Sequence, residues 1–422
     1  MSDTTPRAGG VSRRAFLGRA AVAGVGVVAG GGAGYGIGRA TASDDGTPAE
    51  AGVVPFYGER QAGIATPAQD RLAFAAFDVT TTDVRALAGL LGSWAAAASR
   101  MTRGEAIGPT ETQPQSPPID TGETLGLNPA NLTITVGFGP SLFDDRFGLA
   151  KRRPAALREL PTFAVDVLDP TRCGGDLGVQ ACSDDPQVAF HVIRNFARIG
   201  RGTVALRWSQ LGFGRTSSTS TGQATPRNLF GFKDGTNNIK AEDVDDMEQF
   251  VWVGDDSDQP WMVGGTYLVA RRIRMSIETW DADFIADQER IFGRNKETGA
   301  PLTGTDEFDP PDLAAKDASG AMVIDPGSHI RLSSPSANDG AKILRRGYSF
   351  TDGTDPTTGR LDAGLFFICF NRDPQTQFVA IQNRLGSVDL MNEYIKHTGS
   401  AVFAVPPGVR EVGDWFGREL FA

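Results

Sequence analysis

The segment Asn228–Asn238 (Asn-Leu-Phe-Gly-Phe-Lys-Asp-Gly-Thr-Asn-Asn) holds the densest group of residues able to do chemistry. Glycine on both sides of Phe232-Lys233-Asp234 lets the backbone turn tightly and approach a planar ligand. Asp234 is a candidate for proton transfer, because a carboxylate can accept a proton and return it. The alternative is that Asp-Gly-Thr-Asn is only a turn, since these residue types are typical of turns.

A second group consists of His329-Ile330-Arg331-Leu332 and Leu344-Arg345-Arg346-Gly347-Tyr348. The chain has only three histidines, which limits any metal site built on imidazole. Haem iron needs a single protein ligand, which His329 could supply. The alternative for His329 is a structural histidine. His191, on a predicted helix, and His397, in a predicted loop, have no other candidate ligands beside them.

The elements that must position these residues follow two cycles of strand, helix and strands, which indicates two similar α+β halves. Alternating or continuous apolar residues predict strands at 73–79, 132–139, 176–182, 203–208, 266–275 and 364–370. Helical spacing predicts helices at 83–101, 186–199, 281–292 and 375–390. The polar, proline-rich stretch 104–128 is expected to be a surface loop.

Composition narrows the function classes. Hydrophobic residues make up 40% of the 422 residues, too many for a wholly disordered chain. With 52 glycines and 25 prolines, a loop-rich globular enzyme or binding protein is expected. The net charge of −10 argues against nucleic acid as a partner, because phosphate binding needs a basic face.

The N-terminus is typical of a twin-arginine export signal. Ser12-Arg13-Arg14-Ala15-Phe16-Leu17 precedes an apolar stretch at 20–37 and the small residues Ala40-Thr41-Ala42. We expect a signal peptide over 1–42 that is recognised by the twin-arginine translocation machinery, and a flexible mature N-terminus over 43–55. The alternative is a membrane anchor, but the many glycines make the stretch weakly hydrophobic, so no stable membrane span is expected after cleavage.

Export would place the protein in the periplasm, the cell envelope or the extracellular space. Outside the cell, Cys173 and Cys182 could form a disulfide. Cys369 lies in an apolar run, where a buried thiol is expected.

Taken together, the two groups of motifs resemble those of the dye-decolourising peroxidases. Four further segments support the resemblance: Phe56–Ile64, Gly174–Leu177, Gln288–Lys296 and Asn392–Ser400. The similarity runs from about Val54 to Pro407 and is greatest to the exported branch that includes the bacterial deferrochelatase-type proteins. Because several motifs occur in order, the resemblance is specific.

The resemblance implies an α+β fold of two ferredoxin-like halves in a DyP-type dimeric α+β barrel-like architecture. The N-terminal half would span 56–222 and the C-terminal half 223–422. One haem b per chain would lie mainly in the C-terminal half.

The resemblance also assigns roles to individual residues. His329 would be the proximal ligand of the haem iron, and Asp389 is a candidate to bond its other ring nitrogen and raise its basicity. The alternative for Asp389 is a helix cap. On the distal side, Asp234 would move a proton between the peroxide oxygens, while Arg345 would stabilise anionic peroxide and help heterolysis of the O–O bond.

Three other positions have weaker assignments. Arg345 rather than Arg346 is expected to face the iron, because neighbouring side chains on a strand point to opposite faces. Asn238 and Arg331 are candidate contacts to the cofactor or its propionates. The alternative for Arg331 is a surface cation.

Bulky dyes would not enter a site sized for peroxide, so oxidation at the surface would need electron transfer through aromatic residues. The candidates are Tyr394, Tyr348 and Trp280. The alternative for each is packing in the core.

The resemblance thus predicts an exported haem peroxidase that uses hydrogen peroxide to oxidise dyes, phenols or other one-electron donors. A second hypothesis is a haem-binding, deferrochelatase-like component of iron acquisition or metal handling, with iron-uptake proteins as partners. A third is an extracellular α+β binding protein without haem, which would require the three motifs to occur together by chance.

Overall fold

The computed structural model describes residues 52–422, which belong to one compact unit. The predicted signal peptide over 1–42 lies outside the described residues, as does most of the predicted flexible segment 43–55. Within the described part of the chain, no helix has the length and apolar character needed to cross a bilayer.

The N-terminal half is a four-stranded antiparallel sheet with two helices. Its strands run in the order β4-β1-β3-β2. The bounds of the strands are Arg71–Val79 (β1), Thr133–Phe138 (β2), Leu177–Ser183 (β3) and Val204–Arg215 (β4). The helices are Val84–Met101 (α1) and Pro186–Ile199 (α2). This order, with one helix in each crossover, is the ferredoxin-like arrangement.

The C-terminal half repeats this plan with strand order β9-β5-β8-β7. Its strands are Thr266–Met275 (β5), Leu344–Arg345 (β6), Tyr348–Thr354 (β7), Leu361–Asn371 (β8) and Ile395–Val405 (β9). Its helices are Val244–Phe250 (α3), Ile277–Trp280 (α4), Ile285–Phe292 (α5), His329–Leu332 (α6) and Phe378–Val388 (α7). The two-residue strand β6 pairs with β8 beyond the end of β7.

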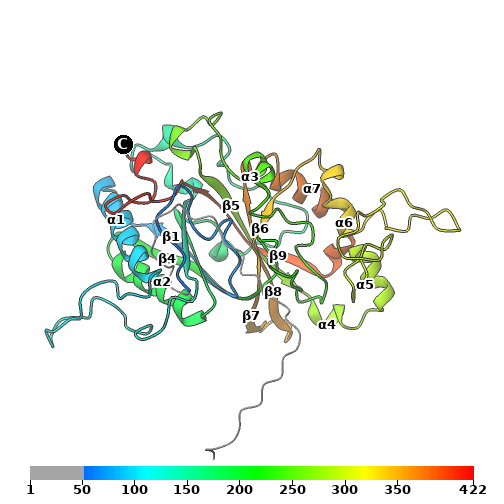
Figure 1. The fold of residues 1–422 in the computed structure, drawn as a ribbon, viewed down its shortest axis with the longest axis horizontal. Coiled ribbons are helices and arrows are strands. Elements are labelled where there is room, and N and C mark those ends of the chain that lie inside the picture. The colour runs from blue at the N-terminus through cyan, green and yellow to red at the C-terminus, as the bar shows by residue number, and fades with distance from the viewer. Residues whose placement is uncertain (1–51) are drawn as a thin grey trace, which may run out of the picture. The chain divides into compact units, whose positions relative to one another are not determined.

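The two sheets join edge to edge and close into a barrel. Strand β2 pairs with β9 through Phe138 and Ala404, and β4 pairs with β7 through Phe213 and Ser349. Figure 1 shows α1 and α2 beside the strands of the first half, and α5, α6 and α7 beside those of the second. The α+β fold of two ferredoxin-like halves is therefore confirmed, while the boundary between 222 and 223 stays a prediction.

The N-terminal half follows local sequence signals closely. Strand β1 is buried along almost its whole length, as expected for a barrel strand covered by helices. Helix α1 begins after Asp83, whose carboxylate accepts a hydrogen bond from the Arg85 N–H, and α2 begins in the same way after Asp185. Both helices begin and end within one residue of the predicted positions.

Two predictions in the C-terminal half are wrong. The helix expected over 281–292 begins only at Ile285, as α5, because Phe284 has an extended backbone, and α4 already ends at Trp280, before this range. His397 lies in strand β9 rather than in a loop. His397 is buried, and its Nδ1 atom accepts a hydrogen bond of 3.1 Å from Arg271, which in turn forms an ion pair with Asp166.

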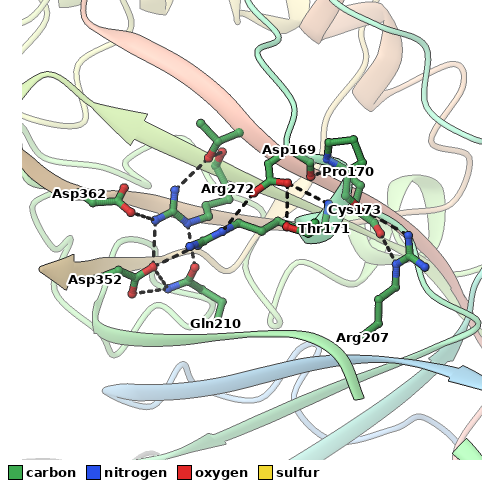
Figure 2. Close-up of polar contacts among 11 residues, drawn as sticks. Asp169, Pro170, Thr171, Cys173, Arg207, Gln210, Arg272, Asp352 and Asp362 are labelled. Atoms are coloured by element: carbon green, nitrogen blue, oxygen red, sulfur yellow. Dashed lines mark hydrogen bonds and ion pairs between the residues drawn. The ribbon is translucent and has the colours of Figure 1, made fainter. Parts of the chain in front are cut away.

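A buried arginine links the halves inside the barrel, as Figure 2 shows. Arg272 of β5 donates to Gln210 of β4 at 3.0 Å, and to Asp352 of β7 at 2.9 Å. It also donates to Asp362 at 2.8 Å and to Thr398 at 2.9 Å. Because the guanidinium is almost fully buried, these acceptors replace the water that it loses on folding.

All three cysteines have free thiols. The disulfide considered for Cys173 and Cys182 is absent because the fold holds the two residues apart. Cys182 is buried in β3, between its partners in β1 and β2, whereas Cys173 pairs with Ser400 beside β9.

Candidate active site

The first part of the site is a histidine held by a carboxylate. His329 begins α6, and its Nδ1 atom lies 2.7 Å from Asp389 Oδ2. The Asp389 side chain is only 2% exposed, whereas that of His329 is 31% exposed. Asp389 Oδ1 also accepts a hydrogen bond from the Met391 N–H, so this residue both caps a turn and holds the imidazole. Within residues 52–422, no hydrogen bond reaches Nε2 of His329, which leaves that nitrogen able to bind a metal.

The charge of Asp389 changes the pKa of His329. Burial would lower the pKa of His329, but the charge of Asp389 and its hydrogen bond outweigh burial, so the pKa of His329 is raised. The charges of Asp234 and Arg345 also act on the pKa of His329, in opposite directions. The two predicted distal residues are therefore within electrostatic reach of the imidazole.

The second part of the site is an ion pair between Asp234 and Arg345. Arg345 Nη1 lies 2.5 Å from Asp234 Oδ1, and both side chains are largely buried. The loop that presents Asp234 turns at two glycines with positive φ angles, Gly231 and Gly235. At Gly235 an added Cβ would come within 3.0 Å of the Ser217 backbone. The segment is therefore both the turn and the carboxylate-bearing loop that its sequence suggested.

Arg345, the last residue of β6, and the next residue, Arg346, point to different parts of the molecule, as predicted from the alternation of side chains along an extended chain. Arg345 reaches Asp234, whereas Arg346 is fully buried and donates to the Thr66 carbonyl and to Gln69 in the N-terminal half.

Asn238 fixes the backbone of Arg345. Its Oδ1 atom accepts from the Arg345 N–H at 2.8 Å, and its Nδ2 donates to the Arg345 carbonyl at 2.9 Å. The same nitrogen donates to the Ser218 carbonyl at 3.0 Å. Asn238 therefore positions the backbone of Arg345, while its expected contact with the cofactor stays a prediction.

Arg331 binds the backbone of the preceding loop, while its expected contact with the cofactor or a propionate stays a prediction. Its Nη2 atom donates to the Ile324 carbonyl at 2.6 Å, and its Nε to the Asp325 carbonyl at 3.2 Å. Arg331 therefore ties α6 to the preceding loop, which helps to hold His329 in place.

The family model described as "Dyp-type peroxidase, N-terminal" matches residues 61–214, and the model described as "Dyp-type peroxidase, C-terminal" matches residues 225–410. The chain belongs to the Dyp-type peroxidase family.

Individual relatives agree with this assignment. A deferrochelatase of Escherichia coli strain K12 is 39% identical over 371 residues, which cover 87% of this chain and 86% of that protein. Structures of DtpA from Streptomyces lividans and of a DyP-type peroxidase from Streptomyces coelicolor each match with a TM-score of 0.80 and 38% identity. Each comparison covers 88% of this chain and 98% of the other. This Dyp-type peroxidase is thus a haem-dependent enzyme that uses peroxide and a reductant.

The residues present fit a haem group. In this Dyp-type peroxidase, His329 offers a free Nε2 atom and has a carboxylate on Nδ1, which is how iron-ligating histidines are commonly held. The ring of Phe292 lies 6.2 Å from the imidazole and is stacked on Phe232 at 4.0 Å. These rings give the site an aromatic wall, which suits a large planar ligand.

Trp280 and Tyr394 lie in the same aromatic cluster. Trp280 is 5.7 Å from Phe292 and 5.0 Å from Tyr394, measured between ring centroids. The Tyr394 hydroxyl donates to the carboxylate of Asp283, and this hydrogen bond raises the pKa of Tyr394. The structure therefore brings two of the three predicted electron-transfer residues to the side of His329.

Tyr348 lies apart from this cluster. It is fully buried in a separate hydrophobic cluster that includes Leu72 and Phe350. Its hydroxyl has no hydrogen-bond partner within the described residues. Tyr348 thus packs in the core, and its role in electron transfer stays a prediction.

The sequence did not reveal Glu307, which anchors the Asp234 loop. Lys233 forms an ion pair with its carboxylate, and Thr236 donates to it at 3.1 Å. Burial would raise the pKa of Glu307, but hydrogen bonds from Lys233, Thr225 and Thr236 outweigh burial and lower it. A half-buried lysine beside Asp234 signals a carboxylate partner, but a partner 74 residues away cannot be identified from spacing.

Proposed function

We propose that this chain is an exported haem peroxidase in which His329 ligates the iron while Asp234 and Arg345 assist cleavage of hydrogen peroxide. The arrangement of the candidate site supports this proposal. A carboxylate-held imidazole with a free nitrogen lies within electrostatic reach of a buried carboxylate–guanidinium pair.

Asp389 prepares His329 for its role. By keeping the proton on Nδ1, it leaves the Nε2 lone pair available for iron and raises the basicity of the ring. When bound, haem supplies the electrons that reduce hydrogen peroxide, and it recovers them from two one-electron donors.

Asp234 transfers the proton that this reaction requires. Cleavage of the O–O bond requires a proton to leave one oxygen of hydrogen peroxide and to reach the other, so that water can depart. The carboxylate of Asp234 accepts this proton and returns it, and the net reaction uses two electrons and two protons to form two waters.

Arg345 stabilises the negative charge of peroxide. Its fixed guanidinium stabilises anionic peroxide, and its bond to Asp234 orients the carboxylate between turnovers. Asn238 contributes indirectly, because it clamps the backbone from which this guanidinium extends.

For dyes and phenols too large to approach the cofactor, we propose electron transfer through Trp280 and Tyr394. Oxidation of a phenol releases its proton, and Asp283 is already placed to accept it from Tyr394. The ring contacts from His329 through Phe292 to Trp280 and Tyr394 support this route.

Replacement of the proposed iron ligand tests the function. His329→Gly should lose the haem absorbance band, and added imidazole should restore it by filling the space that the side chain leaves. His191→Asn, at a distant histidine, is the matched control and should retain haem. Full haem retention by His329→Gly without imidazole would contradict the assignment.

Export rests on the twin-arginine motif at 12–17. In a host with an active twin-arginine pathway, the protein should accumulate outside the cytoplasm and begin after Ala42. Arg13→Lys together with Arg14→Lys should keep it inside, and unchanged export would contradict this part of the proposal.

The second candidate, haem-iron handling, is favoured by the similarity to a protein named deferrochelatase. Incubation with haem and a reductant, without peroxide, distinguishes the two. Release of iron with a rise in metal-free porphyrin fluorescence would support deferrochelatase activity. Stable haem together with peroxide-dependent oxidation of phenols would support the peroxidase.

A further inference from the structure

A cluster of metal-ligating side chains lies in the N-terminal half, where the 104–128 loop meets α2. Figure 1 shows this loop in cyan, extending beyond α2. His191 of α2 is 2% exposed, and its Nδ1 atom lies 3.2 Å from Glu123 Oε1. Its Nε2 atom lies 3.6 Å from Asp120 Oδ1. The expectation that His191 has no candidate ligands beside it is therefore wrong, because the loop brings two carboxylates to it.

A buried amide at the cluster has an unused oxygen. Asn195 lies one turn after His191 on α2 and is fully buried. Its Nδ2 atom is 2.9 Å from Thr121 Oγ1 and 3.2 Å from His191 Nδ1, whereas its Oδ1 has no partner within residues 52–422. Because rotation by 180° exchanges the two amide atoms, Oδ1 can turn toward the same centre. A buried acceptor without a donor is costly, and a cation would satisfy it.

The donor set and its spacing indicate the type of ion. One ligand atom from each of Asp120, Glu123 and His191 lies within 4.8 Å of the other two. A tetrahedral ion with bonds of about 2.0–2.1 Å separates its ligands by roughly 3.3 Å, close to the 3.2 Å between His191 and Glu123. Imidazole disfavours calcium and magnesium, which prefer oxygen, and suits zinc and similar ions.

Charge also favours a dication. The two carboxylates carry two negative charges, and the nearest compensating group is Arg194, at 3.2 Å from Glu123 Oε2. Because the Arg194 side chain is 52% exposed, it can move into solvent when a metal binds.

We propose that Asp120, Glu123 and His191, with Asn195 Oδ1 as a further donor, bind a divalent transition-metal ion, with zinc the best match. This site is separate from the haem ligand, which belongs to the C-terminal half. Its effect is structural, because it fastens a loop without helix or strand to α2.

The test uses haem-loaded, tag-free protein from which other metals have been removed with a chelator. Calorimetric titration with zinc chloride should show one equivalent bound per chain, while calcium chloride should show none. His191→Asn and Glu123→Gln should each weaken zinc binding at least about tenfold, since both remove a direct ligand. Glu111→Gln, in the same loop but outside the cluster, is the matched control and should bind zinc normally.

A second readout is protection of the loop. Zinc should slow cleavage within 104–128 by a nonspecific protease in the parent protein and in Glu111→Gln, but not in His191→Asn or Glu123→Gln. Thermal unfolding identifies any variant that fails to fold, and Glu123→Gln, at the more exposed position, then decides the outcome. The proposal is overturned if zinc does not bind stoichiometrically, or if it binds and protects all variants equally.

Discussion

The two halves of the barrel share one strand order but differ in their crossovers. In the N-terminal half, the crossovers contain continuous helices of 18 and 14 residues. In the C-terminal half, the connection from β5 to β7 contains helices of only 4, 8 and 4 residues. His329 and Arg345 both lie in this broken crossover, and Asp234 lies in the segment that leads into the same half.

This difference explains why the candidate site lies in the C-terminal half. A continuous helix covers its sheet with one apolar face, as α1 does where Trp94 lies 5.3 Å from Phe77 of β1, measured between ring centroids. A crossover of short helices and loops instead presents polar side chains such as His329 from a helix start. The ends of short helices leave backbone groups and side chains free to bind a ligand. We therefore expect substitutions in the first half to change stability and those in the second to change the reaction.

The sharpest contrast is between neighbouring arginines. Arg345→Leu should slow the reaction with peroxide by roughly 10²–10³-fold at nearly unchanged stability, because it removes the group that stabilises developing negative charge. Arg346→Leu should mainly lower the melting temperature, because it leaves Gln69 and the Thr66 carbonyl without their buried donor. Stopped-flow kinetics and thermal unfolding measure the two effects. The same kinetic loss in both variants would break the distinction.

Trp94 tests the structural role of the N-terminal half. Trp94→Ala should lower the free energy of unfolding by about 3–5 kcal/mol, because it leaves a cavity between α1 and α2. The folded variant should still bind one haem and react with peroxide at the parent rate. Denaturant unfolding and haem titration provide the measurements, and loss of haem from fully folded protein would show that the halves are coupled.

Tyr394 tests the proposed electron transfer within the C-terminal half. Tyr394→Phe keeps the ring contact with Trp280 but removes the phenol proton that Asp283 accepts. We expect peroxide to react at the parent rate while turnover of bulky dyes falls several-fold. Small phenols that reach the cofactor serve as the internal control. Unchanged dye turnover would remove Tyr394 from the proposed route.

Glu307 should produce the smallest effect, and one that depends on pH. Its pKa is lowered in the folded protein, so the ionised form stabilises the fold above the unfolded pKa of about 4.5. This stabilisation is lost as pH falls through the lower folded value. Glu307→Gln should therefore reduce the free energy of unfolding by about 1–3 kcal/mol at pH 7, with the difference shrinking below pH 4.5. Unfolding curves from pH 3 to 7 measure it, and a difference independent of pH would contradict the role of charge.

The same division between the halves explains what the sequence could predict. Helices α1 and α2 are specified by local signals, namely capping aspartates and apolar spacing, and their positions were correct. The start of the helix predicted over 281–292 was wrong because Phe284 interrupts a pattern that still has helical spacing. Strand β9 was missed because its polar residues, such as His397, are satisfied by partners far away in the sequence.

Contacts between residues far apart in the sequence also limited what could be predicted of the site. Asp234, Arg345 and His329 could be named because each lies in a compact motif that resembles a known family. Glu307 was missed, and so were the carboxylates beside His191, because these partners are separated by about 70 residues and meet only through the tertiary fold.

We propose that Asp234 moves the proton when peroxide is cleaved beside haem that His329 ligates. The most direct test mixes the haem-loaded protein with one equivalent of hydrogen peroxide in a stopped-flow spectrometer, with Asp234→Asn measured alongside. We predict a rapid change in the haem band in the parent protein and a rate about 10²–10⁴-fold lower in the variant, with haem still bound. An equal rate in both proteins would contradict the claim.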